Sequence, residues 1–462
     1  MYKRIIEDKA FLRRVMAVTI PIMIQNAITN FVSMLDNIMV GQVGQIPMSG
    51  VSIANQLVFI FNLCIFGATS GAGIFTAQFY GCQNHDGIRH TFRFKILSSV
   101  LLSAVGAIIF LQWSDPLINL YLTGEGDPAM AEEALFYGRE YLMVMLFGLL
   151  PFALSTSYAG TLREAGETKI PMIGGIVAVF VNLILNYVLI FGHFGAPAMG
   201  VRGAAWATVI SRFAELGFIA VWTHTHSKLH PFIRGAYCSV YIPGKLLLRI
   251  IIKGSPLLVN EFLWSTGTAF LNQCYSTCGL DVVPALNIAN TMFNLGSVAF
   301  ISMGNAVAII MGQMLGSGEP EDRVRDNNQK LITISCSSGV LFGGLMIAVS
   351  GLFPMLYKAT DSVRHLSTWL ICISGAMLPF HAIAHSCYFT LRSGGKTLIT
   401  FLFDCGFMWG VSVLIAFTLS RFTGISIIPL YAICNGIDII KCFLGLAMVR
   451  KGSWIQNLAE PN

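Results

Sequence analysis

The chain has 462 residues, of which 55% are hydrophobic and only 11% are charged, and its mean hydropathy is +0.69. So low a charged fraction excludes a soluble domain for most of the chain and predicts an integral membrane protein. The formal net charge of +6 does not indicate nucleic-acid binding, because the basic residues are spread over many short segments and form no dense patch.

Twelve stretches are apolar for long enough to span a membrane as helices, which takes about 20 residues each. Runs such as residues 98–113 are continuously apolar, whereas the strands of a membrane β-barrel alternate polar and apolar side chains. The first apolar run continues past residue 36 with no small-residue cleavage site, so we predict an uncleaved first span rather than a signal peptide. The predicted spans are 14–40, 50–80, 92–113, 136–160, 170–192, 200–223, 247–276, 283–315, 329–356, 366–390, 397–420 and 424–449.

The distribution of lysine and arginine predicts the orientation of these spans. With both termini inside, most basic residues fall in cytoplasmic segments, as the positive-inside rule requires, and the segment 113–135 on the other side is acidic. We therefore predict a multi-pass protein of the cell (inner) membrane with both termini in the cytoplasm.

The chain contains an internal repeat. Residues 21–81 match residues 256–316 without a gap at a constant offset of 235, which pairs Pro21 with Pro256 and Gln78 with Gln313. This offset carries span one onto span seven and predicts two six-helix lobes, 1–223 and 247–462, joined by a polar cytoplasmic linker, 224–246. Because six is even, the repeats are parallel and their axis runs along the membrane normal. Such duplication in an apolar chain is typical of secondary transporters.

Polar side chains follow one side of the first span and of its repeat. In the first span they are Gln25, Asn26, Thr29, Asn30, Ser33, Asp36 and Asn37, at helical spacing. Polar stripes inside spans rarely face lipid, so we expect them to line a central cavity between the lobes or to bond neighbouring helices. The predicted substrate cavity comprises Gln25, Asn26, Thr29, Ser33, Asn260, Glu261, Trp264, Ser265 and Thr268.

Two carboxylates, Asp36 and Glu261, lie within these stripes. Ionisable groups in spans are usually functional, and either acid could exchange a proton or bind a cation that replaces it. The fifth span adds Asn182 and Asn186 four residues apart on one face. Amide oxygens are ligands that hard cations such as sodium favour, so one carboxylate, two amides and a hydroxyl would suffice for a cation site.

Several segments together resemble the multidrug and toxic compound extrusion (MATE) transporters. They are DNIMVG (36–41) following Pro21, NLILNYVLIFG (182–192), VRGAAWAT (201–208), NEFLWSTG (260–267) and GSWIQNL (452–458). The resemblance covers nearly the whole chain, including the count of twelve spans, and it implies an all-α membrane fold. It also implies a cation site in the N-terminal lobe formed by Asp36, Asn182, Asn186 and Thr208.

The chain departs from the MATE pattern at two places. Many members have aspartate where this chain has Asn186, so one carboxylate remains and the resemblance leaves sodium and the proton open as coupling ions. Glu261 is similar to the family's seventh-helix glutamate, but a tenth-helix aspartate of the best-known bacterial branch has no counterpart in 366–390. We therefore expect coupling through the N-terminal lobe, with Glu261 helping to bind a cationic substrate or a second ion.

The resemblance implies multidrug efflux: a secondary active transporter, not an enzyme, that exports amphiphilic or cationic organic compounds by sodium- or proton-coupled antiport with alternating access. We expect a monomer without nucleic acid, cofactor or metal other than the coupling ion, with sodium at Asp36 as one possibility. An alternative is a lipid-linked precursor flippase of the same superfamily. A major-facilitator transporter is disfavoured because 81–90 lacks the expected Gly-x-x-x-Asp-Arg motif, and an ATP-driven pump because no GxxxxGK[ST] occurs.

The remaining candidates carry less chemistry. His381 and His385 have zinc-like i, i+4 spacing but no adjacent catalytic glutamate, and we interpret them as cavity-lining or structural. Asp438 and Lys441 are one turn apart and could pair, whereas Asp404 has no obvious partner. The eleven cysteines form no CxxC motif, so we interpret them as small packing residues.

Overall fold

The computed structural model describes the chain apart from residues 1–4, 6, 123–127, 280, 358 and 461–462. The side chains of Met34, Asn37 and Ile38 also lie outside the described residues, and with them the predicted place of Asn37 in the first polar stripe. The described part is helices and turns without a β-strand, which confirms the predicted all-α class.

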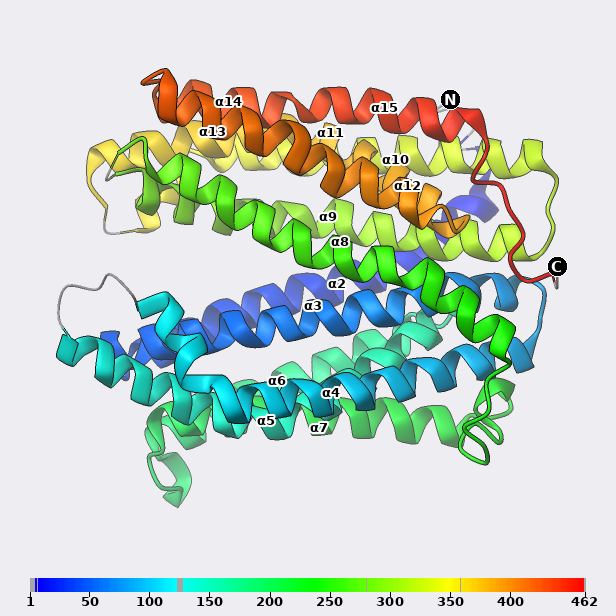
Figure 1. Cartoon of the computed structure of the whole chain (residues 1–462), viewed down its shortest axis with the longest axis horizontal. Coiled ribbons are helices and arrows are strands. Elements are labelled where there is room, and N and C mark those ends of the chain that lie inside the picture. Colours follow the sequence, from blue (N-terminus) through cyan, green and yellow to red (C-terminus); the bar gives the residue numbers. More distant parts are fainter. Residues whose placement is uncertain (1–4, 6, 123–127, 280, 358, 461–462) are drawn as a thin grey trace. The chain divides into compact units, whose positions relative to one another are not determined.

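The helices follow one another as long segments joined by short turns, coloured in chain order in Figure 1. Eleven helical segments of the described chain are long and apolar enough to cross a membrane, and α8 is a further helix of 33 residues at the place of predicted span seven. The α-helices are α2 (Lys9–Gly41), α3 (Gln45–Gly81), α4 (His85–Leu122), α5 (Pro128–Glu164), α6 (Lys169–Phe191), α7 (Gly200–Thr225), α8 (Gly244–Ser276), α9 (Val282–Gly316), α10 (Glu321–Val349), α11 (Asp361–Ser393), α12 (Thr397–Phe401), α13 (Leu414–Phe422), α14 (Ile427–Gly436) and α15 (Asp438–Lys451). Short 3₁₀ turns are η1 (His193–Gly195), η2 (Pro231–Ile233) and η3 (Phe353–Leu356), and two π-helical stretches, η4 (Leu402–Gly406) and η5 (Met408–Val413), connect α12 to α13.

The packing divides the chain into two compact units. The N-unit comprises Ile24–Thr76 and His85–Ile251, and the C-unit comprises Met1–Met23, Ala77–Asn84 and Ile252–Asn462. The division therefore falls inside α2, α3 and α8, and it differs from a single cut in the predicted linker. The packing units do not test whether the two halves of the repeat, 1–223 and 247–462, act as lobes, so that division stays a prediction.

The N-unit is built on α4, α5, α6 and α7: α4 packs on α5, α5 packs on α7, and α7 packs on α6. Its core is a continuous apolar cluster that includes Leu57, Ile65, Leu142 and Val209. The segment predicted as a linker is folded onto this unit: Arg93 on α4 donates to the carbonyl oxygens of Ala236 and Gly235 at 2.8 Å each. Residues 224–246 are therefore largely ordered.

In the C-unit, α9, α10 and α11 pack against one another and α15 packs on α11, as Figure 1 also shows. The first turns of α2 belong to this unit, because Val18 and Ile22 form an apolar cluster with Ala306 and Ile309 of α9. Polar contacts reinforce the docking, since Arg14 donates to Gln313 Oε1 at 2.8 Å.

Two repeat-related glycines let the end of α3 cross α9 at backbone contact. A Cβ on Gly81 would overlap the carbonyl oxygen of Gln313, and a Cβ on Gly316 would overlap the carbonyl oxygen of Gln78. The Gln78 side chain also joins the end of α11 to the turn at Leu458, because its Nε2 donates to Ser393 O at 2.9 Å and its Oε1 accepts from the Leu458 N–H at 2.5 Å. Only glycine permits so close an approach of two backbones.

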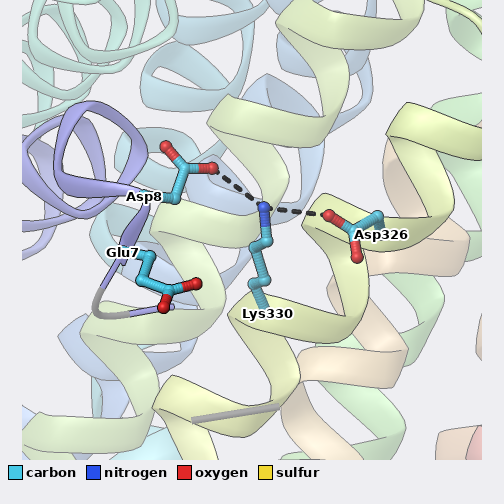
Figure 2. A pocket seen from close by; sticks show the side chains of 4 residues that line it. All are labelled: Glu7, Asp8, Asp326 and Lys330. Carbon is cyan, nitrogen blue, oxygen red and sulfur yellow. Dashed lines mark hydrogen bonds and ion pairs between the residues drawn. The ribbon is translucent and has the colours of Figure 1, made fainter. Parts of the chain in front are cut away.

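An ion-pair cluster ties the N-terminal segment to α10. Lys330 Nζ lies 2.8 Å from Asp8 Oδ2 and 2.9 Å from Asp326 Oδ2, and with Glu7 these residues line a shallow pocket, shown in Figure 2. The residue at the repeat-equivalent position in the N-unit is Lys95, a fully buried lysine whose ammonium pairs with Glu164. The two repeats therefore neutralise the same lysine with different acids.

Candidate functional site

The second half of α2 brings Asp36 against α6 in the N-unit. Asn186 Nδ2 donates to Asp36 Oδ1 at 2.6 Å. With its amide nitrogen facing the carboxylate, Asn182 donates to the same oxygen at 2.8 Å, and its own oxygen then accepts from the Thr208 hydroxyl at 3.3 Å. The structure thus brings together all four residues of the predicted cation site: Asp36, Asn182, Asn186 and Thr208.

Helix geometry explains this convergence. Asn182 and Asn186 are one turn apart on α6, so both amides project from the same face. Thr208 lies on α7, which packs along α6. The Thr208 hydroxyl also lies 3.0 Å from the Ala204 carbonyl oxygen one turn earlier on α7, and its single proton can be donated to that oxygen in place of the Asn182 oxygen. Asp36 therefore faces a wall of neutral polar groups held by two adjacent helices.

The site is rich in oxygen, and Asp36 is the one acid that the described residues bring to it. Asn182 and Asn186 are 5% and 1% exposed, and Asn186 Oδ1 has no hydrogen-bond partner among the described residues. No lysine, arginine or histidine of the described chain forms an ion pair with Asp36. A buried acceptor without a donor, beside a carboxylate without a counter-ion, has the chemistry to bind a proton or a small cation.

Tyr141 of α5 belongs to the same neighbourhood and was not predicted. It is 5% exposed, and its hydroxyl interacts electrostatically with Asp36, Thr208 and Asn55. Nothing in the sequence distinguishes it from other tyrosines of apolar spans, because only the packing of α5 against α7 brings it to the site.

The predicted cavity residues of α2 fall into two groups. Gln25 is engaged, since its Oε1 accepts from Arg163 Nη2 at 2.6 Å, and Asn26 is half-buried. Thr29 and Ser33 are exposed within the described structure, and the Ser33 hydroxyl donates to the Thr29 carbonyl at 3.0 Å. Thr29 and Ser33 are therefore the exposed members of this set.

The predicted cavity residues of α8 lie in the C-unit. Trp264 is 40% exposed, Glu261, Ser265 and Thr268 are half-buried, and Asn260 is buried. Asn260 is committed to the protein, because its Nδ2 donates to Asp404 Oδ2 at 3.1 Å.

The structure changes the interpretation of two other ionisable residues. Asp404 does have a partner: Lys441 Nζ lies 2.6 Å from its Oδ1. Asp438 attracts Lys441 electrostatically, but its contact is with His381, whose Nδ1 lies 3.4 Å from Asp438 Oδ2, so the described residues show no close ion pair of Asp438 and Lys441. Helical spacing on α15 allowed that pair, but neighbouring helices offer both residues closer partners.

The MatE family model matches the chain twice, over residues 21–188 and 256–418, and the second match starts at the offset of the internal repeat. This chain belongs to the MatE family. The predicted resemblance is therefore confirmed, and with it the class of multi-pass membrane transporter.

Among curated proteins, this MatE protein is 25% identical over 452 residues to the probable multidrug resistance protein NorM of Thermotoga maritima, with 96% of this chain and 93% of that protein covered. It is also 25% identical to the probable multidrug resistance protein YoeA of Bacillus subtilis, with 89% and 88% covered. Multidrug resistance protein PmpM of Pseudomonas aeruginosa is 22% identical, with 89% and 84% covered.

Solved structures share the fold. An outward-facing multidrug resistance MATE family transporter of the MOP superfamily superposes with a TM-score of 0.82 at 18% identity, covering 95% of this chain and 96% of that one. A MOP superfamily transporter from Pyrococcus furiosus gives a TM-score of 0.84 at 18% identity, covering 96% of each chain. Both matches extend over nearly the whole of the MatE chain.

Proposed function

We propose that this protein exports amphiphilic or cationic organic compounds in exchange for sodium ions or protons. Its relatives NorM, YoeA and PmpM carry the name multidrug resistance protein. The observation that carries the proposal is the Asp36 carboxylate of α2, which accepts hydrogen bonds from neutral amides and has no ion pair with a basic residue of the described chain. Keeping a carboxylate charged in such surroundings without a counter-ion from the protein costs free energy. A mobile cation would supply the missing positive charge.

The ligand set around Asp36 supports either coupling ion. The carboxylate, the amide oxygens of Asn182 and Asn186 and the Thr208 hydroxyl are the oxygen donors that sodium takes. A proton would need only the carboxylate. Entry of the cation from outside neutralises Asp36, and export of the compound follows from the change in the first helix.

Alternating access between two pseudo-symmetric lobes is the proposed transport mechanism. Pro21 lies inside α2, two residues before the point at which the helix passes from the C-unit to the N-unit. A proline removes one backbone hydrogen bond and weakens the helix there. The state of Asp36 would then be transmitted along α2 through this weak point. We place the protein in the cell (inner) membrane as a monomer with both termini in the cytoplasm, with no enzymatic step.

The test is efflux of ethidium from proteoliposomes, with sodium and pH gradients imposed separately. Asp36→Asn is expected to reduce gradient-driven efflux to background while the protein is recovered at the wild-type level. Asp361→Asn is the matched control, because the Asp361 side chain is fully exposed at the start of α11. Unaltered efflux in Asp36→Asn would refute the mechanism, and the gradient that drives wild-type efflux identifies the ion.

A further inference from the structure

The C-unit contains a second intramembrane carboxylate, Asp404, and both of its oxygens are engaged. Oδ1 lies 2.6 Å from Lys441 Nζ, and Oδ2 accepts from Asn260 Nδ2 at 3.1 Å. The side chains of Asp404 and Lys441 are only 17% and 16% exposed. An ammonium and a carboxylate therefore face each other in a largely enclosed site.

Three separate elements converge to form this site. Asn260 comes from α8, Lys441 from α15, and Asp404 from the π-helical stretch η4. The π-helix is rare, and it appears mostly as short insertions that are frequent at functional positions. Lys441 lies beyond residue 418, where the MatE family match ends. The carboxylate is thus inside the matched region of the chain and its lysine partner outside it.

Each charged group around this pair has its own interaction. On α15, Asp438 lies 3.4 Å from His381 Nδ1. On α8 and α11, Glu261 and Arg392 attract each other electrostatically, and His385 lies in the field of Asp404. Asp438 also attracts Lys441 electrostatically, but among the described residues the acid in contact with the Lys441 ammonium is Asp404.

The neutral neighbours complete a set of oxygen donors. Asn260 is 2% exposed, and its Oδ1 has no hydrogen-bond partner among the described residues. Its Nδ2 is 3.4 Å from the Tyr388 hydroxyl, which also belongs to the wall of the site. A carboxylate, an unused amide oxygen and a phenolic oxygen form a donor set of the kind that surrounds Asp36, but here an ammonium is already present.

The two units differ in what neutralises their intramembrane carboxylates. Asp36 has amide and hydroxyl neighbours and no ion pair with a basic residue of the described chain, whereas Asp404 is paired with Lys441. Removing one partner of a buried ion pair leaves an uncompensated charge, which is strongly destabilising. A free cation would have to displace the ammonium at that cost.

We propose that Asp404 and Asn260 form a site for a monovalent cation that Lys441 occupies as a tethered ammonium, so that this site takes no part in ion exchange. The proposal rests on the proposed function in one respect: it takes Asp36 as the carboxylate that exchanges the coupling ion. It predicts that removing the ammonium while keeping Asp404 opens an additional cation site in the C-unit.

The test counts cations bound per chain in the full-length purified protein. Binding of ²²Na⁺ at alkaline pH and proton uptake on a pH jump are measured for wild type, Lys441→Met, Lys441→Arg and the double variant D404N/K441M. We expect Lys441→Met to bind one more sodium ion or proton per chain than wild type. Lys441→Arg keeps the cation and D404N/K441M removes both charges, so both are expected to match wild type.

Two outcomes would overturn the proposal. One is a monodisperse Lys441→Met protein that binds no more cations than D404N/K441M. The other is a D404N/K441M protein that binds one cation fewer than wild type, which would show that Asp404 already exchanges an ion. The second comparison needs only the charge-neutral pair, so it decides the question even if Lys441→Met does not fold. Neither comparison depends on transport, so a failure of Asp36 as the coupling residue is distinguishable.

Discussion

Changing Asn186 to aspartate would place a second carboxylate where an amide now donates to Asp36 at 2.6 Å. Two unit charges about 4 Å apart repel by about 4 kcal/mol at an effective dielectric constant of about 20. A cation bound between the two carboxylates removes this repulsion, so the variant gains cation affinity. Because Asp36 is only half-buried and water screens part of the repulsion, we expect at least about 1.4 kcal/mol, which is a tenfold change in affinity.

The assay is ethidium efflux from proteoliposomes as a function of sodium concentration and of pH. Asn186→Asp is expected to reach half-maximal rate at a tenfold lower concentration of the coupling cation. Asn186→Leu is the matched control, since it removes the amide without adding charge and should not gain affinity. An Asn186→Asp protein with the cation dependence of wild type would refute the assignment of Asn186 to the cation site.

Three further predictions concern stability. Gly81→Val and Gly316→Val place side chains on opposing carbonyl oxygens, so both should lower the midpoint of thermal unfolding by several degrees. Gly344→Val is the control, because no atom lies near its Cβ position, and it should leave the midpoint unchanged. Equal midpoints for all three variants would contradict the backbone contact between α3 and α9. Glu164→Gln strands the buried Lys95 ammonium and should cost about 3–5 kcal/mol, measured by denaturant unfolding, whereas K95M/E164Q should recover most of it. The hydrogen bond from Lys330 holds the pKa of Asp8 below its usual 3.8. The ionised Asp8 therefore stabilises the folded protein at neutral pH, and this stabilisation is lost as the pH falls below 3.8 through the pKa of Asp8 in the folded state. Asp8→Asn should therefore lower stability at pH 7 by under about 1 kcal/mol, because the pair is partly exposed, and thermal melts should show no difference from wild type once the pH lies below the folded pKa.

The fold was predictable because membrane thickness and the internal repeat constrain it strongly. Continuous apolar runs of about 20 residues can only be helices in lipid, and the match of Pro21 with Pro256 set the second half in register with the first. The ends of the helices were less predictable. For example, α3 begins at Gln45, five residues before the predicted start at residue 50, because the helix includes the mixed segment QIPMSG ahead of the apolar run.

The site around Asp36 was only partly predictable from periodicity. Spacing places Asn182 and Asn186 on one face of a helix, but it does not say which other helix that face meets. The resemblance to MATE transporters supplied the link to Asp36 and Thr208. Tyr141 had neither a motif nor a spacing signal, and only the three-dimensional packing reveals it.

The ion pair of Asp404 and Lys441 could not be predicted from residue spacing along the sequence. The two residues are 37 positions apart on different helices, whereas Asp438 is one turn from Lys441 on the same helix. Local spacing therefore favoured the wrong partner. Tertiary packing overrode it, because His381 stands closer to Asp438 and Asp404 closer to Lys441.

The composition of the C-unit has a practical consequence for dissecting the protein. Its apolar packing includes Val15, Val18 and Ile22 from the beginning of the chain, and Lys330 takes one of its two acids, Asp8, from the same segment. A fragment covering only the second half of the chain would expose these contact surfaces to solvent or lipid. Split-gene experiments should therefore supply the leading segment in trans with the second half, because the two halves of the gene do not encode two self-sufficient folding units.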